Sequence, residues 1–114
     1  MKPQKKHSGS LNTDPRVERA PGIQRVTLTY DADSMMCYFF LKKGARLEQH
    51  THPQSQSGIV IKGRVKFTKA GGEVLDVRAG GAYYFASGEA HGLEIMEDSE
   101  VLECFCPSRD DYKD

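Results

Sequence analysis

Short apolar segments separated by glycines run through most of this 114-residue chain. Val26, Leu28 and Tyr30, for example, alternate with two threonines, which is typical of a strand with one buried face. No segment repeats apolar residues at the spacing of an amphipathic helix. Many short strands with glycine turns indicate a single all-β domain, a sandwich or a barrel. The predicted strands cover residues 26–30, 35–41, 46–50, 58–62, 65–67, 74–77, 82–85, 92–96 and 101–105.

Polar segments flank this region. Residues 1–21 contain lysines, serines and prolines but few apolar side chains, which predicts a flexible polar leader before a domain at residues 22–114. Residues 69–73 and 78–81 contain paired glycines, which tolerate the positive φ of tight turns. The chain has no apolar run of about 18 residues and no apolar core of a secretory signal. We therefore expect a cytoplasmic protein that does not bind membranes.

The balance of charges bears on the binding partners, and the cysteine positions bear on disulfides and metal sites. Lys plus Arg and Asp plus Glu both number 16, so neither a nucleic-acid footprint nor a polybasic membrane patch is expected. Cys104 and Cys106 would share one strand face, where two thiols are poorly placed for a disulfide. We interpret these two residues and Cys37 as small, reduced apolar side chains. A soft metal site or a redox pair is the alternative.

Three histidines and a glutamine have the spacing of a metal centre. His50 and His52 are one residue apart, so their side chains lie on one face of a strand. Gln56 enters on the next strand, and His91 follows Gly88 in a loop. Three imidazoles and one amide oxygen suit a divalent transition metal, with Ni, Zn, Mn, Fe and Co equally compatible. Three unrelated histidines, two of them on a surface turn, are the alternative.

Glycines around these residues complete a two-part motif. It reads Gly44-x5-His50-x-His52-x3-Gln56-x6-Gly63 and then Gly80-x5-Ala86-x-Gly88-x2-His91. This motif resembles that of the cupin superfamily, and the resemblance covers roughly residues 22–112. It implies a small antiparallel jelly-roll (RmlC-like) barrel, usually dimeric. It also implies a divalent metal held by His50, His52, Gln56 and His91.

Three positions depart from the cupin pattern. Gln56 replaces a glutamate, Ala86 a proline and Ile95 an asparagine. Ala86 and Ile95 occupy turn and packing positions. Gln56 matters chemically, because a neutral amide leaves the full charge on the metal, which then polarises a bound oxygen more strongly. An amide also accepts no proton, which favours binding of a small anionic molecule over oxygen chemistry that needs a carboxylate base.

The C-terminal segment offers an acid, an aromatic ring and a guanidinium group. Alternation places Glu103 and Phe105 on one strand face, opposite Cys104 and Cys106. If that face lies inside the barrel, burial would raise the pKa of Glu103, whereas a metal or Arg109 would lower it. The planar fork of Arg109 suits a carboxylate. An outward Glu103 and an ordinary surface Arg109 are the alternative.

The ending Phe-x3-Arg-Asp-Asp-Tyr at 105–112 narrows the resemblance. Together with the motif, it is similar to the small single-domain cupins of uronate catabolism, the KdgF type. These proteins use a metal centre to convert unsaturated monouronates into linear ketouronates. The resemblance implies that Glu103, Phe105 and Arg109 are functional groups, although the type commonly has Asp at the position of Glu103. The extra methylene of Glu103 displaces the carboxylate, which can change activity or substrate.

Three function classes remain open. The first is a metal-dependent enzyme for a small acidic sugar or oxoacid, in which Arg109 holds a carboxylate and Glu103 shuttles a proton. The second is a non-catalytic cupin that binds or senses a small molecule. A metal-dependent dioxygenase comes last, because Gln56 disfavours it. We also expect a homodimer, since the leader and residues 26–30 offer edges for pairing.

Overall fold

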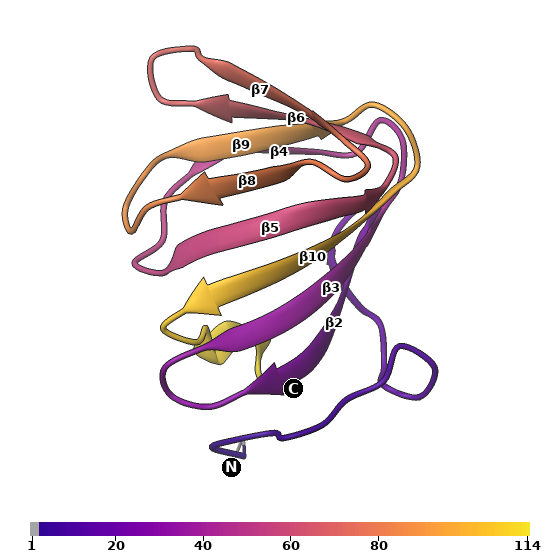
Figure 1. The fold of residues 1–114 in the computed structure, drawn as a ribbon, viewed down its shortest axis with the longest axis vertical. Helices are drawn as coiled ribbons and strands as arrows, with labels where there is room; N and C mark the ends of the chain where they lie inside the picture. The colour runs from indigo at the N-terminus through magenta and orange to yellow at the C-terminus, as the bar shows by residue number, and fades with distance from the viewer. Residues whose placement is uncertain (1–2) are drawn as a thin grey trace.

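In a computed structural model that describes residues 3–114, the chain forms two antiparallel sheets (Figure 1). The larger sheet has six strands in the order β1-β2-β3-β10-β5-β8, and the smaller has four in the order β4-β9-β6-β7. The strands are β1 Val17–Ala20, β2 Ile23–Tyr30, β3 Met35–Leu41, β4 Arg46–His50, β5 Ser55–Lys62, β6 Arg64–Lys69, β7 Val74–Arg78, β8 Ala82–Phe85, β9 His91–Ile95 and β10 Ser99–Cys106. A 3-10 turn, η1 Asp110–Tyr112, follows β10. This arrangement confirms the predicted all-β jelly-roll class.

Side-chain alternation builds the core between the sheets. Along β10, Val101, Glu103 and Phe105 are buried, whereas Cys104 is half-buried and Cys106 is exposed. The predicted inward face of this strand is therefore correct. Burying an aliphatic or aromatic side chain stabilises a fold by roughly 1.5–3 kcal/mol. Most inward positions of both sheets are apolar, so the few polar groups among them stand out as candidates for function.

All nine predicted segments form strands, and the differences lie at their ends. β5 begins at Ser55 rather than at residue 58, so Gln56 is an ordinary strand residue. The sequence predicted that His91 lies in a loop. It is instead the first residue of β9, where it pairs with His50 of β4. Backbone pairing with neighbouring strands decides these ends, and side-chain pattern alone does not reveal it. The hairpin at residues 69–73 has the predicted positive φ at both of its glycines.

The N-terminal segment lies along β2 (Figure 1). Val17–Ala20 form β1, a strand that the sequence did not predict. Lys6 and Tyr30 exchange backbone hydrogen bonds of 2.8 and 3.0 Å. The domain boundary at residue 21 and the flexibility of the leader stay predictions. Within residues 3–114, no helix is long and apolar enough to cross a membrane.

Candidate metal centre

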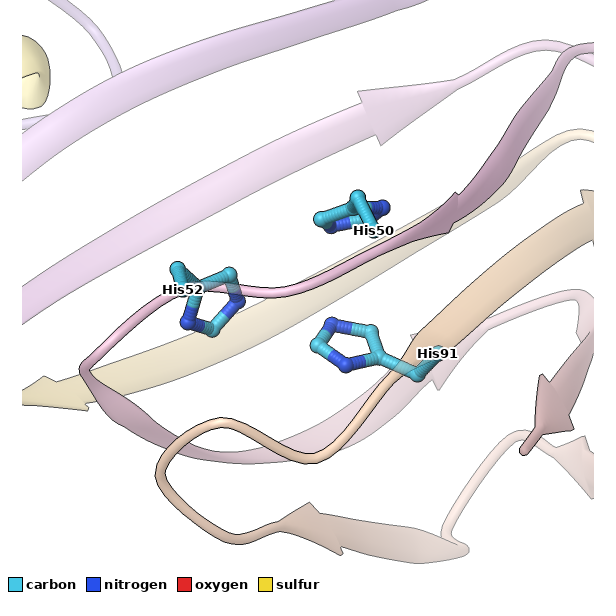
Figure 2. A group of neighbouring side chains, drawn as sticks. All are labelled: His50, His52 and His91. Carbon is cyan, nitrogen blue, oxygen red and sulfur yellow. The ribbon is translucent and has the colours of Figure 1, made fainter.

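Three histidines from separate positions in the sequence lie close to one another (Figure 2). His50 ends β4, His52 follows in the connection to β5, and His91 opens β9. The backbone pairing of His50 with His91 brings two of the rings together. One ring nitrogen from each histidine lies within 4.8 Å of the other two. The cluster can therefore hold a metal ion.

Backbone carbonyls fix the tautomer of all three rings. Each Nδ1 lies 2.9 Å from a carbonyl oxygen two residues away in the chain. The acceptors belong to Glu48, Gln54 and Glu89. Because a carbonyl oxygen only accepts hydrogen bonds, each Nδ1 carries the proton and each Nε2 keeps its lone pair. Imidazoles that ligate metals are oriented in this way.

The environment also favours the neutral imidazoles that a metal needs. Burial lowers the pKa of His52 and of His91, and the neighbouring histidines lower both further. Two of the three rings are thus less readily protonated than a free imidazole. A proton and a metal compete for the same Nε2 lone pair, so these shifts favour the metal.

Gln56 brings an amide oxygen to the same cluster. Its Oε1 lies 3.1 Å from Nε2 of His52, and its amide nitrogen donates a 2.6 Å hydrogen bond to Oε2 of Glu103. Since Nε2 of His52 keeps its lone pair, two acceptors face each other. A cation between them converts this repulsion into coordination. Adjacent ligands of a metal about 2 Å away are themselves separated by about 3 Å, so the donor set fits a divalent metal.

The cavity brings together most of the residues that the sequence singled out. His50, Gln56, His91 and Tyr83 line it, as do a set of apolar side chains from both sheets. The predicted C-terminal groups Glu103, Phe105 and Arg109 line it too. Its volume of about 40 Å³ is enough for a few water molecules. Glu103 therefore does not point outward, and Arg109 is not an ordinary surface residue.

Glu103 is held by two donors. The hydroxyl of Tyr83 and the amide of Gln56 each donate a 2.6 Å hydrogen bond to Oε2. Burial raises the pKa of Glu103, while these hydrogen bonds and the charge of Arg109 oppose the rise. Both bonds use one carboxylate oxygen, so Oε1 is available to a ligand in the cavity.

Arg109 enters the cavity after β10 and is nearly buried, with 9% of its surface exposed. Its Nε and Nη2 donate to the carboxylate of Asp111 at 3.2 and 2.9 Å. Its Cζ lies 4.0 Å from the ring centroid of Tyr112 and 5.5 Å from that of Phe105. These contacts orient a planar guanidinium whose Nη1 group remains available to an anion.

Several lining residues escaped the sequence analysis. Tyr83 and Phe85 alternate with exposed residues on β8, so the pattern indicates that both are buried. A buried phenol needs a hydrogen-bond partner, and this need could have identified Tyr83 as a candidate. Arg19 and Tyr112 also line the cavity and share a 2.9 Å hydrogen bond. Arg19 lies within the segment predicted as a leader, so only the pairing of β1 with β2 brings it to the cavity.

A two-sheet jelly roll with a histidine cluster inside one end defines a class of small β-domains that can hold a metal. Residues 37–106 match the family described as Cupin domain, so the chain belongs to the cupin family. The predicted resemblance is confirmed.

The relatives include proteins of the predicted type. The chain is 32% identical over 100 residues to the pectin degradation protein KdgF of Dickeya dadantii (strain 3937). The aligned region covers 86% of this chain and 90% of that protein. The solved structure of KdgF from Halomonas sp. has a TM-score of 0.85 at 28% identity and covers 93% of this chain and 97% of that one. An RmlC-like cupin from Shewanella frigidimarina NCIMB 400 has a TM-score of 0.89 at 22% identity, with 96% and 98% covered. The last similarity supports the fold alone.

Proposed function

We propose that this protein is a metal-dependent enzyme that converts an unsaturated uronate or a related small oxoacid into a linear ketoacid. One observation carries the proposal. Three histidines and the amide oxygen of Gln56 cluster beside a cavity, which His50, Gln56 and His91 line together with a buried acid, Glu103, and a buried guanidinium, Arg109. The similarity to KdgF proteins supports the substrate class.

Each group has a distinct task in this proposal. A divalent metal held by His50, His52, Gln56 and His91 would supply a Lewis acid that polarises an oxygen of the substrate. Arg109 binds the substrate carboxylate through its free N–H groups. Glu103 takes up and returns a proton at Oε1, the oxygen that neither Tyr83 nor Gln56 occupies. The side chain of Gln56 stays neutral throughout and therefore leaves this task to Glu103.

The size of the cavity bears on substrate entry. A volume of about 40 Å³ accommodates a few water molecules but not a whole sugar acid. Asp111 is exposed and pairs with Arg109, so an incoming carboxylate competes with it for the guanidinium. We expect the segment from Arg109 to Tyr112 to move outward when a substrate binds.

A non-catalytic binding or sensing protein is the second candidate. The small cavity and the existing pair of Arg109 with Asp111 favour it, because both suit a small anion better than a sugar ring. A dioxygenase ranks last, since the neutral Gln56 offers no carboxylate to the metal site.

The first test combines elemental analysis with a ligand screen. The purified protein should contain about one transition-metal ion per chain, and unsaturated uronates or small oxoacids should raise its melting temperature. An active uronate should lose the ultraviolet absorbance of its double bond. His50→Ala should lose both metal and turnover, whereas His7→Ala, which changes an exposed histidine outside the cluster, should keep both. A protein that holds no metal, or full turnover in His50→Ala, would refute the proposal.

A further inference from the structure

We propose that Tyr83 and Glu103 orient the amide of Gln56, so that its oxygen rather than its nitrogen faces the metal, and that Gly58 makes this arrangement possible. Tyr83 and Gly58 are then positioning residues for a metal ligand. The inference rests on the metal centre of the proposed function, but it does not depend on any reaction.

The three strands that carry these residues place them in one row. Glu103 of β10 pairs with Gly58 of β5, and Gly58 pairs in turn with Tyr83 of β8. Tyr83 is therefore two strands away from Glu103, yet its hydroxyl reaches the carboxylate at 2.6 Å. The aromatic ring must cross over the strand between them.

Gly58 provides the space for this crossing. A Cβ atom at position 58 would lie 2.4 Å from both Cζ and the hydroxyl oxygen of Tyr83. Real Cβ atoms essentially never approach that closely, so any side chain at this position would displace the ring. A glycine inside a strand often marks such a close approach. The backbone of Gly58 does not have a positive φ, so a steric role is the remaining reason for a glycine.

Two hydrogen bonds converge on one oxygen of Glu103. The hydroxyl of Tyr83 donates to Oε2 of Glu103, and the amide nitrogen of Gln56 donates to the same oxygen. A carboxylate accepts but does not donate, so it selects the nitrogen side of the amide. The opposite side, Oε1 of Gln56, is left 3.1 Å from Nε2 of His52.

An amide needs such a constraint because its two ends have nearly the same shape. A rotation of the Gln56 amide by half a turn would place N–H donors beside the metal, where they cannot coordinate. Tyr83 is buried, and its ring lies 4.2 Å from that of Phe67, so the phenol is a fixed support for the carboxylate. Groups that orient metal ligands typically contribute 10- to 100-fold to metal affinity.

The test measures Co²⁺ binding to the metal-free full-length protein, by competition with a chelator and by the d–d absorption spectrum of the bound ion. Tyr83→Phe keeps the ring and removes the hydroxyl, and Gly58→Ala forces the ring aside. Both should weaken Co²⁺ binding by about 10- to 100-fold and change the spectrum toward that of Gln56→Ala. Tyr84→Phe and Ser57→Ala, at neighbouring outward positions, are the matched controls and should match the wild type.

A double variant separates positioning from a general loss of stability. If Tyr83 acts through Gln56, adding Tyr83→Phe to Gln56→Ala should cause little further loss of Co²⁺ affinity. Additive losses, or an unchanged spectrum in Tyr83→Phe, would overturn the inference.

The outcomes also distinguish this inference from the proposed function. A wild-type protein that binds no Co²⁺ would remove the metal centre and the inference together. If Gln56→Ala weakens binding while Tyr83→Phe retains wild-type affinity and spectrum, the metal centre stands and the inference fails. Should Gly58→Ala not fold, Tyr83→Phe alone decides.

Discussion

At the scale of single residues, the site depends on which atom of each side chain is already engaged. The three histidines use Nδ1 for backbone carbonyls, so Nε2 is left for a metal. Glu103 divides its two oxygens in the same way, with Oε2 engaged by Tyr83 and Gln56. Oε1 is thus the atom that we expect to exchange a proton with the substrate.

Removing that proton acceptor should separate catalysis from metal binding. Glu103→Gln keeps an acceptor oxygen for Tyr83 and Gln56 but has no carboxylate. Turnover on an active uronate should fall by about 10²- to 10⁴-fold, while the metal content stays at the wild-type level. Steady-state kinetics and elemental analysis on the same preparation check both points. Glu94→Gln, on the exposed face of β9, is the matched control.

Two other outcomes of this experiment would depart from this expectation, and they mean different things. Full activity in Glu103→Gln would eliminate proton transfer by this residue and favour the binding-only alternative. Loss of metal from Glu103→Gln would show that the acid supports the ligands in a way that an amide cannot reproduce.

At the scale of elements, β10 presents different chemistry on its two faces. The inward face bears Glu103 and Phe105, and the outward face bears Cys104 and Cys106. β3 pairs with β10 and carries Cys37 on its buried face. The alternation that places Glu103 in the cavity therefore also gives the three thiols different exposure: Cys37 is buried, Cys104 is half-buried and Cys106 is exposed.

Thiol reactivity should follow that alternation. Burial raises the pKa of Cys37 to about 12, so at pH 8 only about 10⁻⁴ of it is thiolate. Burial also raises the pKa of Cys104. A disulfide reagent should label the exposed Cys106 first, Cys104 more slowly and Cys37 only after unfolding, as mass spectrometry of digests would show. Rapid labelling of Cys37 in the native protein would contradict the described packing.

The N-terminal segment offers a test of pH dependence. The backbone N–H of Ser10 and the ammonium of Lys6 lower the pKa of Asp14 below its ordinary value of 3.8. These partners favour ionised Asp14 only when the segment is folded, so the carboxylate stabilises the folded segment. This stabilisation is complete above pH 3.8 and is lost as the pH falls through the lowered pKa of Asp14. Amide-exchange protection at Lys6 and Tyr30, relative to unfolded-chain rates, should fall over that range.

Asp14→Asn should reproduce this loss at neutral pH, because it removes the charge and keeps the shape. Asp33→Asn, an exposed acid on the β2–β3 connection, is the control and should leave the protection at Lys6 unchanged. Equal protection in Asp14→Asn and the wild type would mean that the ion pair with Lys6 does not hold the segment.

At the scale of the whole molecule, the larger sheet exposes apolar side chains to the outside. The outer face of the larger sheet bears apolar side chains, among them Ile59, Ile61 and Tyr84, which are 37%, 49% and 59% exposed. Apolar residues grouped on a sheet face are typical of protein interfaces. Part of the β2 edge that the sequence suggested for pairing is already occupied by β1 and by Lys6.

We propose that the protein is a homodimer that uses this apolar outer face. Light scattering at micromolar concentration should give twice the mass of one chain, and Tyr84→Glu should shift the protein toward the monomer. Val74→Glu places the same charge on an exposed apolar position of β7 in the other sheet and should not change the mass. A monomeric wild type, or dissociation by both substitutions alike, would contradict the proposal.

The sequence by itself determined the strands from β2 to β10, apart from some of their ends, the inward face of β10 and the identity of the metal-ligand candidates. Alternation with period two is a local property, so it correctly placed Glu103 and Phe105 together and set them apart from Cys104. Motif spacing was also sufficient to bring His50 and His91 into one group, which their backbone pairing explains.

Only the tertiary structure decided which groups touch across strands. The contact of Tyr83 with Glu103 depends on two strand registers and on the missing side chain of Gly58, and no spacing in the chain encodes it. The same holds for Arg19, which reaches the cavity through the pairing of β1. Registers arise from the packing of the whole sheet, so the hydrogen bonds that orient Gln56 cannot be read from local pattern.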